Sequence, residues 1–531
     1  LYFSSLIVGI LIGFSFSKAV IMILFKITDT KGIAKLHFSE EALIQTLIVF
    51  GAIYLLIMTM NYLFIKRQTI LALFRVTSST EGKTKKISIL EIIIGILGMI
   101  FIASGYYISA KLFDGSFTSM NALAIAMISI LASVIIGTYL FYKGSVRFLL
   151  NLMRKSKKGY LSINDVLSLS SIMFRMKSNA LLLTVITTVS ALAIGFLCLS
   201  YISYYSAEKS AGDYVPNDFA INNSKDAASF KAELDRKKIA YTEKKIDVIQ
   251  VKANVKNILE NELKSPMVDS SAMTIPMISE KSVNGVDVAP NETLFTGYNN
   301  MLQKTMAFKD SGQIELKGKQ KVIPQKFVGL NRKFLLSTYF TGGGLPTAIV
   351  DDSVFNKFKQ DADPSIQKES SVYTGIDISK ETDVKKANQL FAKMTFSDNS
   401  LNASRMETVV SQKQNMGLIM FIVGFLGLAF LITSGCILYF KQMDESEDEK
   451  PNYTILRKLG FTEKDLLNGI KIKQLFNFGI PLIVGLLHSY FAVQSGWFWF
   501  GTEVWTPMII VMIVYTALYS IFGILSVLYY K

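Results

Sequence analysis

Long apolar runs constrain the fold of this chain more than any other feature of its sequence. A helix needs about 20 mostly apolar residues to cross the hydrocarbon core of a bilayer. Half of the residues are hydrophobic and the mean hydropathy is +0.37, which is typical of an integral membrane protein. The runs that are long enough to be transmembrane helices are 2–25, 42–65, 88–109, 119–142, 179–203, 416–440, 475–494 and 507–530.

Basic residues between these runs predict the orientation of the chain in the membrane. Lysine and arginine concentrate in loops that face the cytoplasm. Loop 66–86, segment 143–178 and segment 441–473 are rich in both, whereas loops 110–118 and 495–506 hold one lysine between them. The three basic stretches are therefore predicted to be cytoplasmic.

Residues 204–413 form a polar segment that this topology places outside the cell. The segment is long enough for one domain, and it holds 29 Lys and Arg against 26 Asp and Glu. Most of the net charge of +15 therefore belongs to the membrane part, and no nucleic-acid partner is needed to explain it.

Both cysteines, Cys198 and Cys436, lie in predicted membrane helices. An outer domain without disulfides fits the surface of a Gram-positive cell.

Short periodic patterns within the outer segment predict an α+β domain. The stretches predicted to be strands are 245–253, 312–318, 346–351 and 372–378. Two amphipathic stretches, 225–235 and 380–394, are predicted to be helices. The predicted fold class is therefore an α-helical transmembrane protein with one α+β extracellular domain.

The sequence signatures of a catalytic subunit are absent. The chain has no GxxxxGK[ST] phosphate loop, no HExxH, no CxxC and no GxSxG. We therefore expect no catalytic residues, no metal site and no cofactor in this chain. His37 lies in an outer loop, and His488 lies in a predicted membrane helix. An intramembrane histidine can relay protons, but we favour a packing role for His488.

Segment 441–473 carries the most informative local pattern. It opens with acidic residues that lack the spacing of a calcium loop and are predicted to form a solvated helix face: Asp444, Glu445, Glu447, Asp448 and Glu449. Pro451 is expected to break the helix that continues from the membrane. A short helix is predicted at 453–459, with Gly460 as its C-cap and Thr462 as the N-cap of the next helix.

The short helix has an apolar face made by Ile455, Leu456 and Leu459. A capped amphipathic helix on the cytoplasmic side fits docking into a groove of a soluble partner. A helix that lies on the lipid surface has the same spacing. The pattern alone leaves both interpretations open.

The same segment resembles the coupling region of the FtsX-like permease family, which includes the type VII ABC transporters. The family's apolar-Arg-x-x-Gly pattern reads Ile455-Leu456-Arg457-Lys458-Leu459-Gly460-Phe461 here. Further segments are similar to the bacitracin-resistance permeases of this family: 175–206, 420–443 and 488–497. Segment 64–75 is similar to the family's exit from its fourth helix.

The resemblance implies ten transmembrane helices, with the outer domain between the seventh and the eighth. The sequence shows eight, with the domain after the fifth. We therefore expect two further helices, and a first coupling helix, before Leu1. Five segments are implied. Residues 1–142 hold four transmembrane helices, which are an incomplete N-terminal FtsX-like half and two further helices. They are followed by a basic cytoplasmic connector (143–178), a transmembrane helix (179–203), an extracellular sensor domain (204–413), and a C-terminal FtsX-like half with three transmembrane helices and the coupling segment 441–473 (414–531).

The resemblance also implies a function. Such permeases pair with two copies of a separate ABC ATPase subunit, which binds ATP and Mg. They bind cell-wall-active peptide antibiotics or lipid-carrier complexes of these peptides, free the lipid target and signal to a sensor histidine kinase. The chain would then act in resistance in the cell membrane of a Gram-positive bacterium. The residues implied in coupling to the ATPase are Tyr453, Ile455, Leu456, Arg457, Leu459, Gly460 and Phe461.

Three further groups of residues are candidates for function. The glycines along helix 416–440 can permit close packing of helices, and they are Gly417, Gly424, Gly427 and Gly435. The tryptophans at the outer interface fit an aromatic belt or a lipid or peptide contact, and they are Trp497, Trp499 and Trp505. The lysines that fit an anionic headgroup or pyrophosphate, or simply a solvated strand pair, are Lys317, Lys319 and Lys321.

Two other functions fit parts of the sequence. An FtsX-like mechanical transmitter would activate a cell-wall hydrolase, although such proteins usually have four membrane helices. A stand-alone membrane receptor would bind its ligand with the outer domain and signal without an ATPase. Co-purification with an ATPase subunit separates the receptor from the permease.

Overall fold

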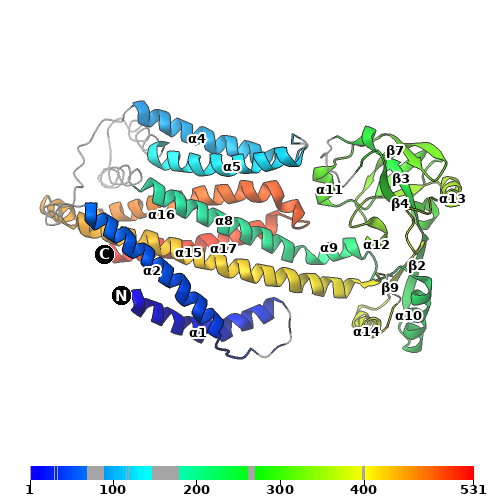
Figure 1. Cartoon of the computed structure of the whole chain (residues 1–531), viewed down its shortest axis with the longest axis horizontal. Coiled ribbons are helices and arrows are strands. Elements are labelled where there is room, and N and C mark those ends of the chain that lie inside the picture. Colours follow the sequence, from blue (N-terminus) through cyan, green and yellow to red (C-terminus); the bar gives the residue numbers. More distant parts are fainter. Residues whose placement is uncertain are drawn as a thin grey trace.

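The computed structural model of the chain is a long helical bundle with a sheet-containing domain at one end (Figure 1). It describes residues 2–28, 30, 32, 34–67, 89–114, 116–117, 119–145, 179–260, 269–396 and 401–530. The predicted loop 66–86, the segment 64–75 and the connector 143–178 therefore lie mostly outside the described residues.

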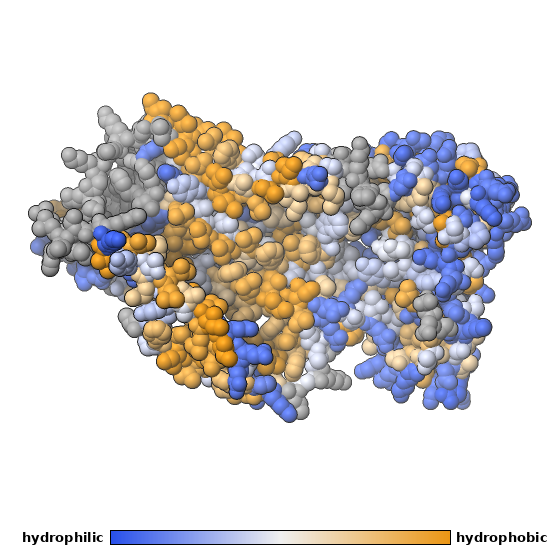
Figure 2. All heavy atoms as spheres, viewed as in Figure 1, coloured by the Kyte–Doolittle hydropathy of each residue, from blue (hydrophilic) through white to orange (hydrophobic). Residues whose placement is uncertain are grey.

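Each predicted transmembrane run is a helix, and these helices are long and apolar enough to cross a membrane. They are α1 (Tyr2–Ile27), α2 (Glu40–Arg67), α4 (Ile89–Ala110), α5 (Met120–Leu140), α8 (Ala180–Tyr205), α15 (Arg405–Lys458), α16 (Glu463–Gly496) and α17 (Trp505–Tyr530). Figure 2 shows apolar side chains over the bundle and polar ones over the outer domain. This distribution is what a lipid environment requires, because lipid contacts favour apolar surfaces.

Helices α8, α15, α16 and α17 form the centre of the bundle. Their buried side chains make one apolar cluster that includes Ile194, Leu431, Phe478 and Tyr519. The α4–α5 hairpin lies on one side of this centre and the α1–α2 pair on the other (Figure 1). No residue of α1 is buried. The centre is therefore a packed unit, whereas α1 and α2 expose most of their surface.

Glycines bring α4 into backbone contact with the end of α5 and with η1 (Phe141–Ser145), the π-helical turn that continues it. A Cβ atom added to Gly98 would lie 2.7 Å from the Phe141 nitrogen, and one added to Gly144 would lie 2.7 Å from the Gly95 nitrogen. Small residues permit such close helix packing in membranes. These glycines were not predicted as packing residues, unlike those of α15, although Gly95 and Gly98 occupy neighbouring positions of one helix face.

His488 on α16 joins the α4–α5 hairpin to the centre of the bundle. Its Nδ1 lies 2.6 Å from the Tyr106 hydroxyl, and its Nε2 lies 2.8 Å from the Thr138 hydroxyl. Thr138 already donates its proton to the Val134 carbonyl at 2.6 Å. Thr138 must therefore accept from Nε2–H, and Nδ1 accepts from Tyr106, so the neutral ring is fully hydrogen-bonded. This geometry supports the packing role.

The outer domain holds two sheets. One is an antiparallel sheet of order β10-β1-β9-β2, and the other is a closed barrel of order β3-β4-β8-β5-β7-β6. The strands are β1 (Phe219–Ile221), β2 (Tyr241–Asp247), β3 (Ile249–Asn254), β4 (Met273–Ser279), β5 (Glu292–Thr296), β6 (Gly312–Lys317), β7 (Val322–Asn331), β8 (Thr347–Val350), β9 (Val372–Ile378) and β10 (Ala403–Ser404). The helices are α9 (Ala207–Tyr214), α10 (Ser224–Arg236), α11 (Asn300–Thr305), α12 (Thr338–Thr341), α13 (Asp352–Gln360) and α14 (Glu381–Phe391).

The predicted strand 245–253 is wrong as a single strand. It spans the end of β2 and most of β3, which belong to different sheets. Between them Val248 donates its N–H to the Ser371 carbonyl at 2.8 Å. One continuous apolar pattern is thus divided between two sheets. The reason is that the end of a strand depends on the strands it pairs with, and these lie far along the chain.

Helix α15 is longer than the sequence predicted. It runs without a break through Phe440, where a membrane helix was expected to end, and through Pro451, where a break was expected. A proline inside a helix removes one backbone hydrogen bond. Pro451 is exposed, so water can satisfy the carbonyl that loses its partner. The predicted separate helix 453–459 is therefore the last part of α15.

The outer end of α15 is tied to the base of the outer domain. Arg405 donates its backbone N–H to the Asp218 carbonyl at 2.9 Å and its Nε to the Val215 carbonyl at 3.0 Å. Its guanidinium also donates to the Pro216 carbonyl. The Asp218 carboxylate accepts the Ile378 N–H from β9 at 2.9 Å. The first turn of α15 is thus fixed to the small sheet of the domain.

We expect Gly98→Ala to lower the thermal stability of the purified protein. The new Cβ would meet backbone atoms of Phe141, which cannot move aside like a side chain, so a cost of about 1–3 kcal/mol is expected. Gly479→Ala is the control, because a Cβ there meets nothing within 4 Å. Thermal unfolding in detergent checks this, and equal midpoints for the two variants would contradict it.

Candidate functional site

The candidate site is the hairpin of α15 and α16 at the end of the molecule opposite the outer domain (Figure 1). The two helices meet at residues 459–462. We call the residues predicted for ATPase coupling, other than Tyr453, the coupling tip: Ile455, Leu456, Arg457, Leu459, Gly460 and Phe461. The structure places all of them at this turn.

A glycine C-cap ends α15. Gly460 has φ +98°, a conformation that favours glycine over other residues. Its N–H bonds to the Arg457 carbonyl at 3.1 Å, and the Phe461 N–H bonds to the Leu456 carbonyl at 3.2 Å. These two bonds are those of a Schellman motif, which satisfies carbonyls that a helix end would leave unpaired. The predicted C-cap role of Gly460 is confirmed.

A capping box starts α16 two residues later. The Thr462 hydroxyl accepts the Asp465 N–H at 3.2 Å, and the Asp465 carboxylate accepts the Thr462 N–H at 3.2 Å. The Thr462 hydroxyl also donates to the Asp465 carboxylate at 2.6 Å, and this bond, together with the one from the Thr462 N–H, holds the pKa of the Asp465 carboxyl below its usual range. Their contribution to stability is present at neutral pH and is lost only as the pH falls through that lowered pKa. Arg457 and Glu463 form an ion pair of 2.6 Å across the turn.

The coupling tip exposes apolar side chains. Leu459 is 70% exposed and Ile455 is 56% exposed, while Leu456 is half-buried. Exposed apolar groups on a turn fixed by caps at both helix ends form a rigid protrusion. Such a protrusion fits insertion into a groove of a partner.

Tyr453 lies apart from the coupling tip, although the resemblance grouped them. Its hydroxyl donates to the Glu449 Oε2 at 3.2 Å. Glu449 also forms an ion pair of 2.6 Å with Lys473 of α16. Lys473 in turn donates to the Tyr530 hydroxyl of α17 at 3.2 Å. Tyr453 therefore belongs to a polar cluster behind the tip.

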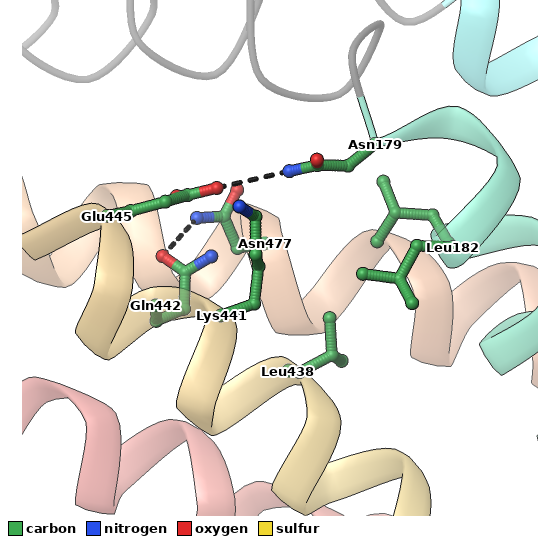
Figure 3. Close-up of a pocket in the computed structure, with 8 residues that line it drawn as sticks. Asn179, Leu182, Leu438, Lys441, Gln442, Glu445 and Asn477 are labelled. Atoms are coloured by element: carbon green, nitrogen blue, oxygen red, sulfur yellow. Dashed lines mark hydrogen bonds between the residues drawn. The ribbon is translucent and has the colours of Figure 1, made fainter. Parts of the chain in front are cut away.

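This polar cluster continues toward the bundle (Figure 3). The Gln442 Oε1 accepts from Gln474 Nε2 at 3.1 Å and from Asn477 Nδ2 at 2.9 Å. Asn179, just before α8, donates to Glu445 Oε1 at 3.1 Å. Four helices are thus joined by polar side chains at this end of the bundle.

The prediction of a solvated acidic face is wrong for two of its five residues. Glu445 is 5% exposed, and the Glu449 side chain is 13% exposed. Asp444 and Glu447 are exposed, as predicted. A signal for the buried pair was present in the sequence, because the inward stripe of α15 continues at helical spacing: Leu431, Leu438, Gln442, Glu445 and Glu449.

A small cavity of about 10 Å³ lies within the polar cluster. It is lined by Asn179, Leu182, Leu183, Leu438, Lys441, Gln442, Glu445 and Asn477. Its volume is close to the space of one water molecule. The cavity is therefore too small for a peptide or a lipid, and the cluster serves helix contacts.

The predicted packing glycines of α15 face three different helices. A Cβ on Gly417 would lie 3.1 Å from the Ile27 carbonyl oxygen of α1, and one on Gly427 would lie 2.8 Å from Leu197 of α8. Gly435 faces the ring of Phe522 on α17, with no room for a Cβ. Gly424 has ordinary space, with Leu197 at 3.9 Å. Three of the four glycines thus lie at close contacts, and a role in movement stays a prediction.

The predicted tryptophans lie at the outer end of the bundle, in or near η4 (Trp497–Trp499). Trp499 is 47% exposed and Trp505 is 55% exposed, whereas Trp497 packs against the central cluster. In the next loop the Thr502 carbonyl accepts from Asn300 Nδ2 of the outer domain at 3.3 Å. A lipid or peptide contact of these side chains stays a prediction.

The predicted lysines lie at the turn between β6 and β7. The Asp361 carboxylate, at the end of α13, accepts the Lys321 N–H at 2.7 Å, and the Asp361 carbonyl accepts the Lys319 N–H at 2.8 Å. Helix α13 lies on the side of the outer domain that faces away from the bundle (Figure 1). Lys317, Lys319 and Lys321 are therefore remote from the lipid-facing surface, and their contact with an anionic ligand stays a prediction. Among the described residues, no group of His, Cys, Asp and Glu could hold a metal ion.

We expect Thr462→Ala to loosen the start of α16. Loss of an N-cap side chain costs about 1 kcal/mol, which is roughly a fivefold rise in local opening. Hydrogen exchange of peptides that cover 462–468 should accelerate by that factor. Thr454→Ala is the control, because the Thr454 hydroxyl bonds to the Lys450 carbonyl within α15 and caps no helix. Equal exchange in both variants would show that the capping box does not hold the turn.

Comparisons with known proteins are consistent with this architecture. No family model matches the chain. The bacitracin export permease protein BceB of Halalkalibacterium halodurans is 62% identical over 531 residues, which is 100% of this chain and 82% of that protein. The protein of the same name from Bacillus subtilis is 60% identical over the same shares of both chains. The ABC transporter permease protein YxdM of Bacillus subtilis is 24% identical over 92% of this chain and 75% of its own length.

The extent of these matches decides the family. Identity of 60% or more across all 531 residues includes the bundle, the outer domain and the coupling tip. The chain therefore belongs to the BceB family of ABC transporter permeases.

Proposed function

We propose that the chain is the membrane subunit of an ABC transporter that senses bacitracin-like cell-wall-active peptides and confers resistance to them. Its similarity to two bacitracin export permeases over its whole length carries this proposal. ATP and Mg bind to a separate ATPase subunit, present in two copies. The permease supplies the recognition domain and the membrane helices that transmit the movement of the ATPase subunits. It carries out no chemistry itself.

Helix α15 supports this proposal because it joins the two ends of the molecule. At a rise of 1.5 Å per residue, its 54 residues span about 80 Å. One end is fixed to the outer domain through Arg405, and the other end carries the coupling tip. A movement of the ATPase subunits would therefore displace the outer domain through one helix.

Docking of the coupling tip on the ATPase is the cytoplasmic half of the proposal. The exposed Leu459 and Ile455 provide apolar contact, and the Arg457–Glu463 pair provides a polar edge. A helix that lies flat on lipid presents its apolar face along its length. Here the apolar residues gather at a capped turn, which favours a protein groove over a lipid surface.

The second half of the proposal is that the outer domain recognises the peptide or its lipid-carrier complex. The outer domain contacts the α16–α17 loop through Asn300 and Thr502, next to the exposed Trp499 and Trp505. We propose that this region meets the lipid-borne complex. Release of the lipid target is then signalled to a sensor histidine kinase.

We expect Leu459→Asp to abolish co-purification with the ATPase subunit and to leave the thermal unfolding midpoint unchanged. The side chain is 70% exposed, so a charge there costs the free permease little but opposes burial in a partner. Leu401→Asp is the matched control, because Leu401 of the outer domain is also 70% exposed. Retained co-purification in Leu459→Asp would remove the tip from the docking site.

We expect deletion of the gene to sensitise its host to bacitracin. Growth inhibition by bacitracin and by several lantibiotics, measured with and without the complementing gene, identifies the peptides that the transporter handles. Unchanged sensitivity to all of them would refute the proposed function. A permease that never associates with an ATPase would instead favour the stand-alone receptor, and a defect in cell-wall hydrolysis would favour the mechanical transmitter.

A further inference from the structure

An ion pair between the part-buried Glu449 and the fully buried Lys473 occupies the base of the α15–α16 hairpin. Lys473 is 1% exposed, and its Nζ lies 2.6 Å from the Glu449 Oε2. Tyr453 of α15 and Tyr530 of α17 hydrogen-bond to the two charged groups. The Tyr530 hydroxyl also donates to the Gln442 carbonyl at 3.1 Å. One charged pair thus joins three helices, about two helical turns from the coupling tip.

The two arms of the hairpin depend on such long polar side chains. Helix α15 makes few direct contacts with α16, and both pack mainly against α8 and α17. Among the described residues, the polar links between them include the Glu449–Lys473 pair, the bonds of Gln442 to Gln474 and Asn477, and the Arg457–Glu463 pair at the turn. Apolar packing between the arms therefore does little to fix their relative position.

A buried ion pair is well suited to fix that position. Its desolvation offsets much of its attraction, so it adds little stability compared with apolar side chains of the same size. Separation of the two groups, however, would leave a charge buried without its counter-charge, which is strongly unfavourable. Sliding of α15 along α16 is therefore resisted much more strongly than apolar packing alone would resist it.

We infer that Glu449 and Lys473 are positioning residues that lock the register of α15 against α16, so that a displacement of the coupling tip reaches α17 and the rest of the bundle. This inference rests on the proposed function of the tip. Neither residue is part of the exposed coupling tip. Variants of the pair are therefore expected to keep docking on the ATPase and to lose transmission of its movement. Glu449 was predicted to lie on a solvated helix face, and no role was predicted for Lys473.

The test uses the permease with its ATPase subunit, in a strain that lacks the chromosomal gene. Lys473→Met is expected to keep co-purification and ATP hydrolysis within about twofold of wild type, and to lower the inhibitory concentration of bacitracin at least fourfold. Lys471→Met is the matched control, since Lys471 is an exposed lysine on the same helix, two residues before Lys473. Wild-type resistance in Lys473→Met at equal protein level would overturn the inference, as would loss of co-purification together with resistance.

A double variant covers the case in which Lys473→Met fails to accumulate. Glu449→Leu with Lys473→Met removes both charges and keeps side chains of similar size, so it is expected to accumulate. Because no charge pair remains to hold the register, it is still expected to assemble and hydrolyse ATP with reduced resistance. Full resistance in the double variant would show that transmission does not need the pair.

Spin labels provide a readout that does not depend on resistance. Thr454→Cys and Lys471→Cys place labels at exposed positions of the two arms, outside the cluster and the tip. We expect one narrow distance distribution with the native pair and a broader one with Lys473→Met. An unchanged distribution would refute the positioning role. If gene deletion leaves bacitracin sensitivity unaltered, the proposed function fails. The distance distribution between the two spin labels still tests the positioning role independently.

Discussion

Helix α15 is the element on which the rest of the structure depends, because it is a single hydrogen-bonded rod of 54 residues. Its outer turn is held by Arg405 against the base of the outer domain, and its inner end carries the turn to α16. A helix resists stretching along its axis because backbone hydrogen bonds close its turns, and Pro451 removes only one of these bonds from α15. The outer domain and the coupling tip are therefore parts of one mechanical element, and the other helices set how that element can move.

Different interactions hold the helices around this rod. Backbone contact through Gly95, Gly98 and Gly144 joins α4 to α5, and the doubly hydrogen-bonded His488 joins that pair to α16. Polar side chains join α15, α16 and α17 at the end near the coupling tip. Apolar packing surrounds all of them and faces lipid. Directional contacts are thus concentrated where the proposed mechanism needs a defined helix register.

Local patterns predicted much of the fold and of the candidate site. The apolar runs, the C-cap at Gly460 and the N-cap at Thr462 depend on residues close in sequence, and all were found as expected. Two of the wrong predictions concern residues whose state depends on distant partners. Glu449 pairs with Lys473 of another helix, and the apolar stretch 245–253 is shared by two sheets. Pro451 stays within α15 because water at its exposed position can satisfy the carbonyl that loses its partner.

The sequence by itself determined that this chain spans a membrane, carries one large outer domain and has a helix that ends at a capped turn. These properties follow from hydrophobic length, charge asymmetry and capping chemistry, which act over a few residues or add along the chain. Only the tertiary structure decided that Tyr453 and Glu449 belong to a buried cluster and that α4 and α5 touch through glycines. The reason is physical: burial of a charge or a close approach of backbones exists only once helices far apart in sequence are brought together.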